Sequence, residues 1–178
     1  MTTEPIDPLR HPIGTWQPQE SYTLADIKQL VDQIRTLPDV YALVLADATP
    51  NDLQKQYRPG SWTVRQLIHH VADIHMLHFM RLKNALVNPG TPGILVDMDG
   101  WAALNEAQNA PVTDSLTMLK GIHQRIAFLA GSLQPEDLAV SYYHPIRQRD
   151  LTIPQALSMT VWHGEHHLAH IRLAMQSA

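Results

Sequence analysis

The sequence contains no cysteine among its 178 residues, which removes disulfides, thiolate zinc sites and a cysteine nucleophile together. No apolar run approaches the roughly 18 residues that span a membrane, and residues 1–11 lack the apolar core of a signal peptide. Lysine and arginine form no run and the formal charge is -4, so the basic footprint of a nucleic-acid-binding protein is missing. We therefore expect a cytoplasmic protein whose partners are small molecules or a second copy of itself, with no nucleic acid and no membrane.

Strand patterns are nearly absent as well, whereas apolar residues recur at helical spacing in four stretches. The predicted helices span residues 23–47, 63–86, 113–130 and 152–175. Three of them begin with the pattern of a capping box, at Thr23, Thr63 and Thr152. Pro38 is expected to break or kink the first helix. The sequence thus predicts one all-α domain over residues 1–178, a four-helix bundle with a broken first helix.

The segments between the helices carry weaker signals. Residues 1–20 hold four of the 13 prolines and no period, so we expect an extended arm that lies on the body. Residues 87–112 are predicted to be a long irregular connection, a candidate flap with one short helix near residues 101–106. Residues 142–145 (YYHP) are expected to form a loop. A turn and a tyrosine-bearing loop precede each of the two capped helices that contain His70 and His163. This similarity favours two similar helix pairs, an arrangement that brings the second and fourth helices together.

Histidine is the residue type that points to chemistry. Four of the 11 histidines fall within eight residues of the last predicted helix, in the run WHGEHHLAH at residues 162–170. On a helix this spacing makes two pairs four residues apart, and each pair directs two imidazoles towards one point. At about 100° per residue, His163 and His167 lie on the flank of the apolar face, whereas His166 and His170 turn further towards the polar side. A metal site is one hypothesis, and a solvated polar stripe is the other.

The second predicted helix supplies a third candidate ligand. His70 falls on the apolar face of that helix, while His69 points away. A buried histidine needs a hydrogen-bond partner or a metal, because an unpaired buried polar group costs about 1–3 kcal/mol. Taken alone, a histidine at the position of His70 is more often a core residue with a hydrogen-bond partner than a metal ligand. Together with the pair on the neighbouring helix it predicts a site of His70, His163 and His167. Three neutral imidazoles suit Zn²⁺, Ni²⁺, Co²⁺ or Fe²⁺ and leave a position for water or substrate.

These segments resemble a known family. Residues 57–73 (YRPGSWTVRQLIHHVAD) and 162–171 (WHGEHHLAHI), the loop at 143–145 (YHP) and the arm at 11–14 (HPIG) are similar to the YfiT branch of the DinB superfamily. The resemblance covers nearly the whole chain. It implies a four-helix bundle, a homodimer and one divalent metal ion held by histidines that match His70, His163 and His167. Members of the family are described as metal-dependent hydrolases, and relatives transfer low-molecular-weight thiols such as bacillithiol, mycothiol or glutathione onto electrophiles.

Three functions remain open from the sequence. The first is a hydrolase whose divalent ion, with Zn²⁺ or Ni²⁺ expected first, activates water. The second is a thiol S-transferase in which the same ion activates a thiol. The third is a non-catalytic metal-binding protein with a fourth protein ligand, for which the candidates are His144, His166 and His170.

Substrate contacts and the general base are less constrained. Side chains that can orient an anionic substrate, with surface or loop packing as their alternative role, are Tyr57, Arg65, Tyr143 and His144. Glu165 lies between the predicted ligands in the sequence but on the other side of the helix. We therefore do not nominate it as the base.

Overall fold

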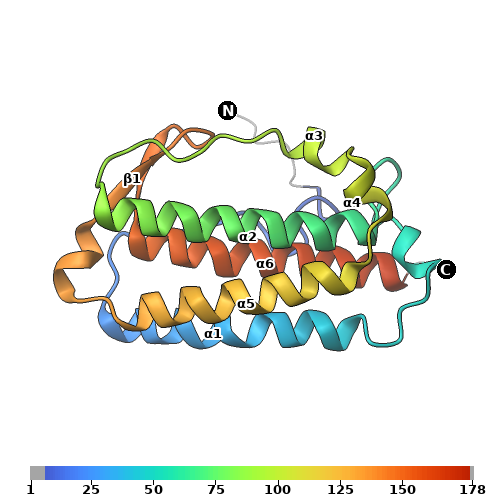
Figure 1. The fold of residues 1–178 in the computed structure, drawn as a ribbon, viewed down its shortest axis with the longest axis horizontal. Helices are drawn as coiled ribbons and strands as arrows, with labels where there is room; N and C mark the ends of the chain where they lie inside the picture. The colour runs from blue at the N-terminus through green and yellow to red at the C-terminus, as the bar shows by residue number, and fades with distance from the viewer. Residues whose placement is uncertain (1–6, 177–178) are drawn as a thin grey trace.

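Four long helices lie side by side and form the body of the protein (Figure 1). In this computed structural model, which describes residues 7–176, they are α1 (Leu24–Val44), α2 (Val64–Val87), α5 (Val112–Gly131) and α6 (Ile153–Gln176). The predicted all-α four-helix bundle is confirmed, and the three predicted capping boxes begin α1, α2 and α6. None of the helices in the described part is long and apolar enough to cross a membrane.

The helices α2 and α5 are neighbours that run in the same direction. His69 of α2 bonds to Ser115 of α5, and further along both helices His75 bonds to His123. Two parallel neighbours need a connection as long as the bundle, because the chain has to return to the end from which it started. Residues 88–111 provide this connection and run back along α2 (Figure 1).

The connection contains two short helices where the sequence predicted one. They are α3 (Met98–Ala102) and α4 (Asn105–Asn109). Side chains from the first turn of α2 hold the connection in place: Arg65 Nη1 donates to the carbonyl of Ala110 at 2.6 Å, and Gln66 Nε2 donates to that of Ala102 at 2.8 Å. These two bonds hold the last part of the connection against the first turn of α2.

The break expected at Pro38 is not present, since α1 continues through this residue. Proline has no N–H, so the carbonyl of Ile34 loses the hydrogen bond that residue 38 would otherwise donate. The ring Nδ1 of His123, on α5, donates to this carbonyl at 2.6 Å. A side chain from the neighbouring helix therefore replaces the missing bond and allows α1 to remain one helix.

A small hairpin stands where the sequence predicted a loop. The strands β1 (Ser141–His144) and β2 (Arg149–Thr152) pair antiparallel, with Tyr142 opposite Leu151. Both of these side chains are buried, whereas that of Tyr143, the next residue of β1, is exposed. Strands of four residues are too short to establish an alternating pattern in the sequence, which is why the prediction was wrong here.

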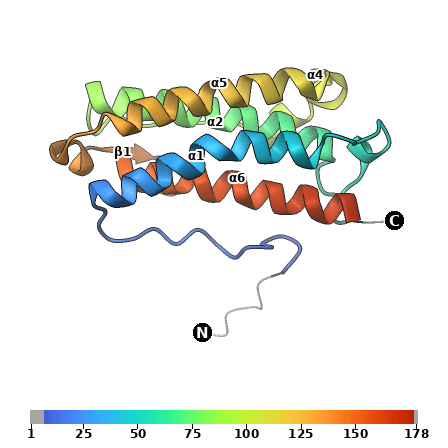
Figure 2. The ribbon, with the colours of Figure 1, turned by 90° about the horizontal axis from the view of Figure 1, so that it is seen from below.

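The segment before α1 lies against α6. Residues 7–22 form no helix or strand and follow the bundle on the α6 side (Figure 2). Trp16 is buried and its indole Nε1 donates to Ser158 Oγ at 3.2 Å, and Arg10 contributes its carbonyl to His170. The first six residues of the predicted arm lie outside the described part.

The core is divided by a layer of histidines. One apolar cluster includes Ile34, Phe79 and Ile126, and a second includes Leu37, Val71 and Leu119. Between these two clusters, buried polar side chains come from three helices, and they are His70, His75, His78, His123 and Thr160. Buried polar groups need partners, so this layer is the natural place to look for a functional site.

Candidate metal centre

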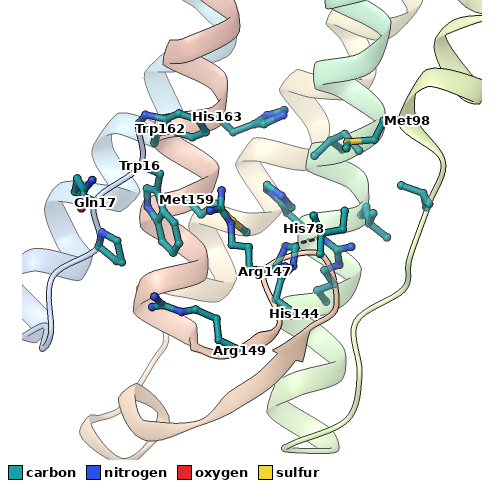
Figure 3. A pocket seen from close by; sticks show the side chains of 16 residues that line it. Trp16, Gln17, His78, Met98, His144, Arg147, Arg149, Met159, Trp162 and His163 are labelled. Carbon is teal, nitrogen blue, oxygen red and sulfur yellow. Dashed lines mark hydrogen bonds between the residues drawn. The ribbon is translucent and has the colours of Figure 1, made fainter. Parts of the chain in front are cut away.

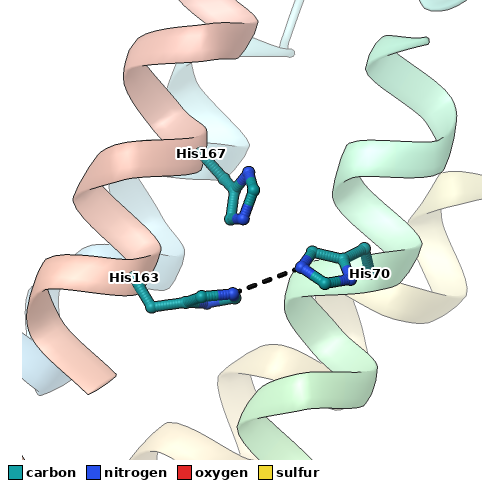
Figure 4. A group of neighbouring side chains, drawn as sticks. All are labelled: His70, His163 and His167. Carbon is teal, nitrogen blue, oxygen red and sulfur yellow. Dashed lines mark hydrogen bonds between the residues drawn. The ribbon is translucent and has the colours of Figure 1, made fainter. Parts of the chain in front are cut away.

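His70 of α2 and His163 and His167 of α6 converge (Figure 4). Each offers one ring nitrogen, and these three atoms lie within 4.8 Å of one another. The Nε2 atoms of His70 and His163 are 3.2 Å apart. Two nitrogens bound to one tetrahedral zinc ion at the usual bond lengths lie about 3.3 Å apart. The structure thus brings together the three residues that the sequence predicted, at a spacing that fits one transition-metal ion.

The protonation state of these imidazoles also suits a metal. Burial lowers the pKa of His70 to about 4. Burial, followed by the neighbouring imidazoles, holds the pKa values of His163 and His167 well below the usual 6.5. Only a neutral imidazole has a lone pair for a metal. At neutral pH all three side chains are therefore in the form that can act as ligands.

The turn of α6 that carries two of these histidines is held tightly against α1. The buried hydroxyl of Tyr41 donates to the carbonyl of Gly164 at 2.7 Å. A Cβ atom at Gly164 would overlap Leu37 Cδ2 and lie 3.2 Å from His75 Cε1. Glycine at this position lets α6 approach its neighbours closely, and this close approach positions His163.

A large cavity of about 550 Å³ opens beside His163 (Figure 3). Its charged lining consists of Arg81 of α2 and of Arg147 and Arg149 on the hairpin, and none of the described residues that line it is acidic. Arg81 is buried; its Nη2 donates to the carbonyl of Ile94, but its Nε has no partner among residues 7–176. An arginine remains charged when buried, so Arg81, Arg147 and Arg149 give this cavity a positively charged lining.

A second cavity of about 380 Å³ lies on the other side of the histidines, next to His167. Its lining holds two arginines, Arg10 and Arg58, one acid, Asp99, and three further imidazoles, which are His11, His166 and His170. The helices α2 and α6 are antiparallel, as the pairs His70–His163 and His78–Thr160 establish. The two cavities therefore lie towards opposite ends of the bundle, with the candidate ligands between them.

Comparison with known proteins agrees with this arrangement. The sequence profile of the DinB superfamily matches residues 33–171. The chain belongs to the DinB superfamily. A relative from Bacillus pumilus, named "Putative metal-dependent hydrolase", is 41% identical over 164 residues, which is 92% of this chain and 93% of that protein. Bacillus subtilis YfiT, which bears the same description, is 34% identical over 92% of each chain.

The fold is shared with a solved structure. The structure described as "YfiT from Bacillus subtilis is a probable metal-dependent hydrolase with an unusual four-helix bundle topology" aligns with a TM-score of 0.91. It is 31% identical and covers 93% of this chain and 95% of its own. The parallel α2 and α5 fit that description of the topology.

The other residues predicted from the sequence are scattered around this DinB bundle. Tyr57 lines the smaller cavity and stacks on His170, with ring centroids 3.9 Å apart. His144 is buried and lines the larger cavity, and its Nε2 lies 3.5 Å from Nη1 of Arg81. Arg65 binds a backbone carbonyl of the connection and lines neither cavity, and Tyr143 is exposed on the hairpin. The substrate roles of these four side chains remain predictions.

The positions predicted for His166 and His170 were wrong. Neither faces solvent: both are buried, because residues of the N-terminal arm cover that side of α6. His166 stacks on Trp162 and lies next to His11. Glu165, in contrast, is exposed on the far side of α6, as expected, and lines a separate hollow beside α1.

Sequence reasoning missed the arginines of the larger cavity and the buried histidines behind the candidate ligands. Arg81 follows His70 by eleven residues, which is about 20° more than three whole turns, so the two share a face of α2. His123 lies four residues after Leu119 and three before Ile126, on the apolar stripe of α5. Both signals were present in the sequence. Arg147 and Arg149 had none, because the hairpin that positions them was not predicted.

Proposed function

We propose that this chain is a metal-dependent hydrolase in which His70, His163 and His167 hold one divalent ion, Zn²⁺ or Ni²⁺. The observation that carries the proposal is the set of three neutral imidazoles, spaced for one ion and placed beside a cavity. When bound, such an ion lowers the pKa of a coordinated water and so supplies a nucleophile at neutral pH. Three protein ligands leave a coordination position for that water.

The larger cavity indicates the chemical class of substrate. The guanidinium groups of Arg81, Arg147 and Arg149 would bind an acidic group, since arginine pairs well with carboxylate and phosphate. The indoles of Trp16 and Trp162 and the side chain of Met159 would contact an apolar part of the same molecule. We therefore expect a small anionic substrate whose reacting bond lies at the His163 end.

A thiol S-transferase is the second candidate, and the second cavity favours it. A transferase has to hold a thiol and an electrophile at once, and here a cavity with arginines in its lining lies on each side of the proposed metal site. Low-molecular-weight thiols such as glutathione carry carboxylates, which Arg10 and Arg58 would bind in the smaller cavity. A purely structural metal is less well supported, because the only group of candidate ligands found among residues 7–176 has three members rather than four.

Metal content and turnover test these alternatives. Protein purified without a histidine tag is expected to hold about one ion per chain; His70→Ala and His163→Ala should abolish binding, and the control His166→Ala, which removes a buried imidazole outside the group, should retain it. The loaded enzyme is then offered acidic esters and amides, and separately an electrophile with a panel of thiols. Turnover without thiol would refute the transferase, and adducts formed only with thiol would refute the hydrolase. Sedimentation of the same sample tests the proposed homodimer.

A further inference from the structure

A chain of hydrogen bonds leads from a backbone carbonyl to a candidate metal ligand. The Nδ1 of His123 lies 2.6 Å from the carbonyl oxygen of Ile34. The Nε2 of His123 lies 2.6 Å from Nδ1 of His75, and the Nε2 of His75 lies 3.1 Å from Nδ1 of His163. The other nitrogen of His163, Nε2, is the one that faces His70 (Figure 4).

The direction of every bond in this chain is determined. A carbonyl oxygen only accepts, so His123 must carry its proton on Nδ1. A neutral imidazole has one N–H, so the bare Nε2 of His123 accepts from Nδ1 of His75. By the same reasoning the bare Nε2 of His75 accepts from Nδ1 of His163. The Nε2 of His163 is consequently left with a lone pair, directed at the candidate metal position.

A shorter chain has the same effect on His167. The Nε2 of His170 lies 3.3 Å from the carbonyl oxygen of Arg10, in the N-terminal arm, and must donate to it. The bare Nδ1 of His170 lies 3.4 Å from Nδ1 of His167 and accepts a hydrogen bond from the N–H at that position. The Nε2 of His167 is therefore also free. Two independent chains, each ending on a backbone carbonyl, thus select the same nitrogen in the two ligands of α6.

We propose that His75, His123 and His170 are positioning residues that fix the tautomers of His163 and His167, so that both rings present a free Nε2 before any metal arrives. Metal-binding histidines usually donate their second nitrogen to a carboxylate, a carbonyl or water; here the partner is another histidine. The inference about metal rests on the proposed metal site, but the tautomers are a property of the metal-free protein.

Nitrogen-15 NMR of the uniformly labelled, metal-free full chain measures the tautomers directly, because protonated and bare ring nitrogens have well-separated shifts. We expect the Nδ1–H form for His75, His123, His163 and His167, and the Nε2–H form for His170. Finding His163 in the Nε2–H form would overturn the proposal. This measurement needs no variant, so it stands even if a substitution prevents folding.

Three variants then connect the tautomer to metal binding, with zinc affinity measured by competition with a chromogenic chelator. His123→Met removes the acceptor for His75, which frees His75 to protonate at Nε2 and donate to His163. We expect His163 to shift to the Nε2–H form and zinc affinity to fall roughly 10- to 100-fold. His123→Gln should rescue both, because its amide donates to Ile34 and accepts from His75. His69→Met is the matched control, an equally buried histidine of α2 that bonds to Ser115 outside both chains, and should change neither.

The outcomes separate this proposal from the proposed function. The inference would be overturned by equal losses of zinc affinity in His123→Met, His123→Gln and His69→Met with the tautomer of His163 unchanged. In that case the buried histidines would serve only to pack the core. Absence of zinc binding in the wild type would instead refute the metal site. In that case the NMR pattern of the wild type would still decide whether the two chains fix the tautomers.

Discussion

Acidification of the metal-free protein should unfold it well above the pH at which most globular domains fail. Six histidines in the interior of the bundle have pKa values that burial lowers far below 6.5, and they are His70, His75, His78, His123, His163 and His167. Because their folded-state pKa is lower than the unfolded value of about 6.5, the unfolded state binds more protons. Stability is therefore constant above about pH 7 and falls as the pH drops through 6.5 towards the folded-state value, which is about 4 for His70 and His123.

The magnitude follows from linkage between protonation and folding. A histidine that stays neutral in the folded state lowers the free energy of unfolding by about 1 kcal/mol at pH values between 6.0 and 5.5, because only the unfolded state takes up the proton. Six such groups together remove several kcal/mol, on the order of the total stability of about 5–15 kcal/mol for a typical domain. Urea unfolding of the metal-free protein at pH 7.5, 6.5, 6.0 and 5.5 measures this directly. A total loss below about 2 kcal/mol at pH 5.5 would show that the histidine layer is not buried in neutral form, and His123→Gln should reduce the loss by about one sixth.

Three further predictions concern the same region. Tyr41→Phe removes one hydrogen bond to the Gly164 carbonyl and should lower the free energy of unfolding by about 0.5–1.5 kcal/mol in urea titrations, with zinc affinity unchanged; a larger loss would mean that the hydroxyl has another role. Arg81→Met should reduce kcat/KM for acidic substrates by roughly 10- to 100-fold, as expected for a charged hydrogen bond, and leave neutral substrates of the same shape unaffected; equal losses for both would contradict the anion site. Zinc at 100 times its Kd should stabilise the wild type by about 2.7 kcal/mol in thermal or urea unfolding, and the same gain in His163→Ala would contradict the ligand assignment.

The helices and the three converging histidines were accessible from sequence because both depend on local geometry. Apolar spacing and threonine caps identify a helix wherever its buried face is continuous, and the angle of each residue about the axis follows from its number. The separation of four residues between His163 and His167 needs no knowledge of the rest of the fold. Pairing with His70 required only that the second and fourth helices be neighbours, which the similarity of their preceding segments favoured.

What sequence could not supply were the contacts made by segments without a period. The arm covers His166 and His170 and turns a face that reads as polar into a buried one. The hairpin brings Arg147 and Arg149 to the larger cavity, and its strands are too short to predict. Pro38 reads as a helix breaker because local rules do not include a side chain such as His123, which comes from another helix to replace the missing bond.

The two histidine chains also bear on the charge of the site. A carboxylate behind each ligand would make the imidazole more basic and add negative charge to the core, whereas Ile34 and Arg10 contribute only neutral carbonyls. Three neutral ligands would leave a bound divalent ion with its full charge, and the nearest charged side chains that line the larger cavity are arginines rather than acids. An anionic substrate would therefore be attracted along the whole cavity towards the ion. Replacing His75 by Glu should test this argument: the added negative charge is expected to tighten zinc binding while weakening turnover of acidic substrates, and a gain in both would contradict the view that a neutral histidine layer serves anion binding.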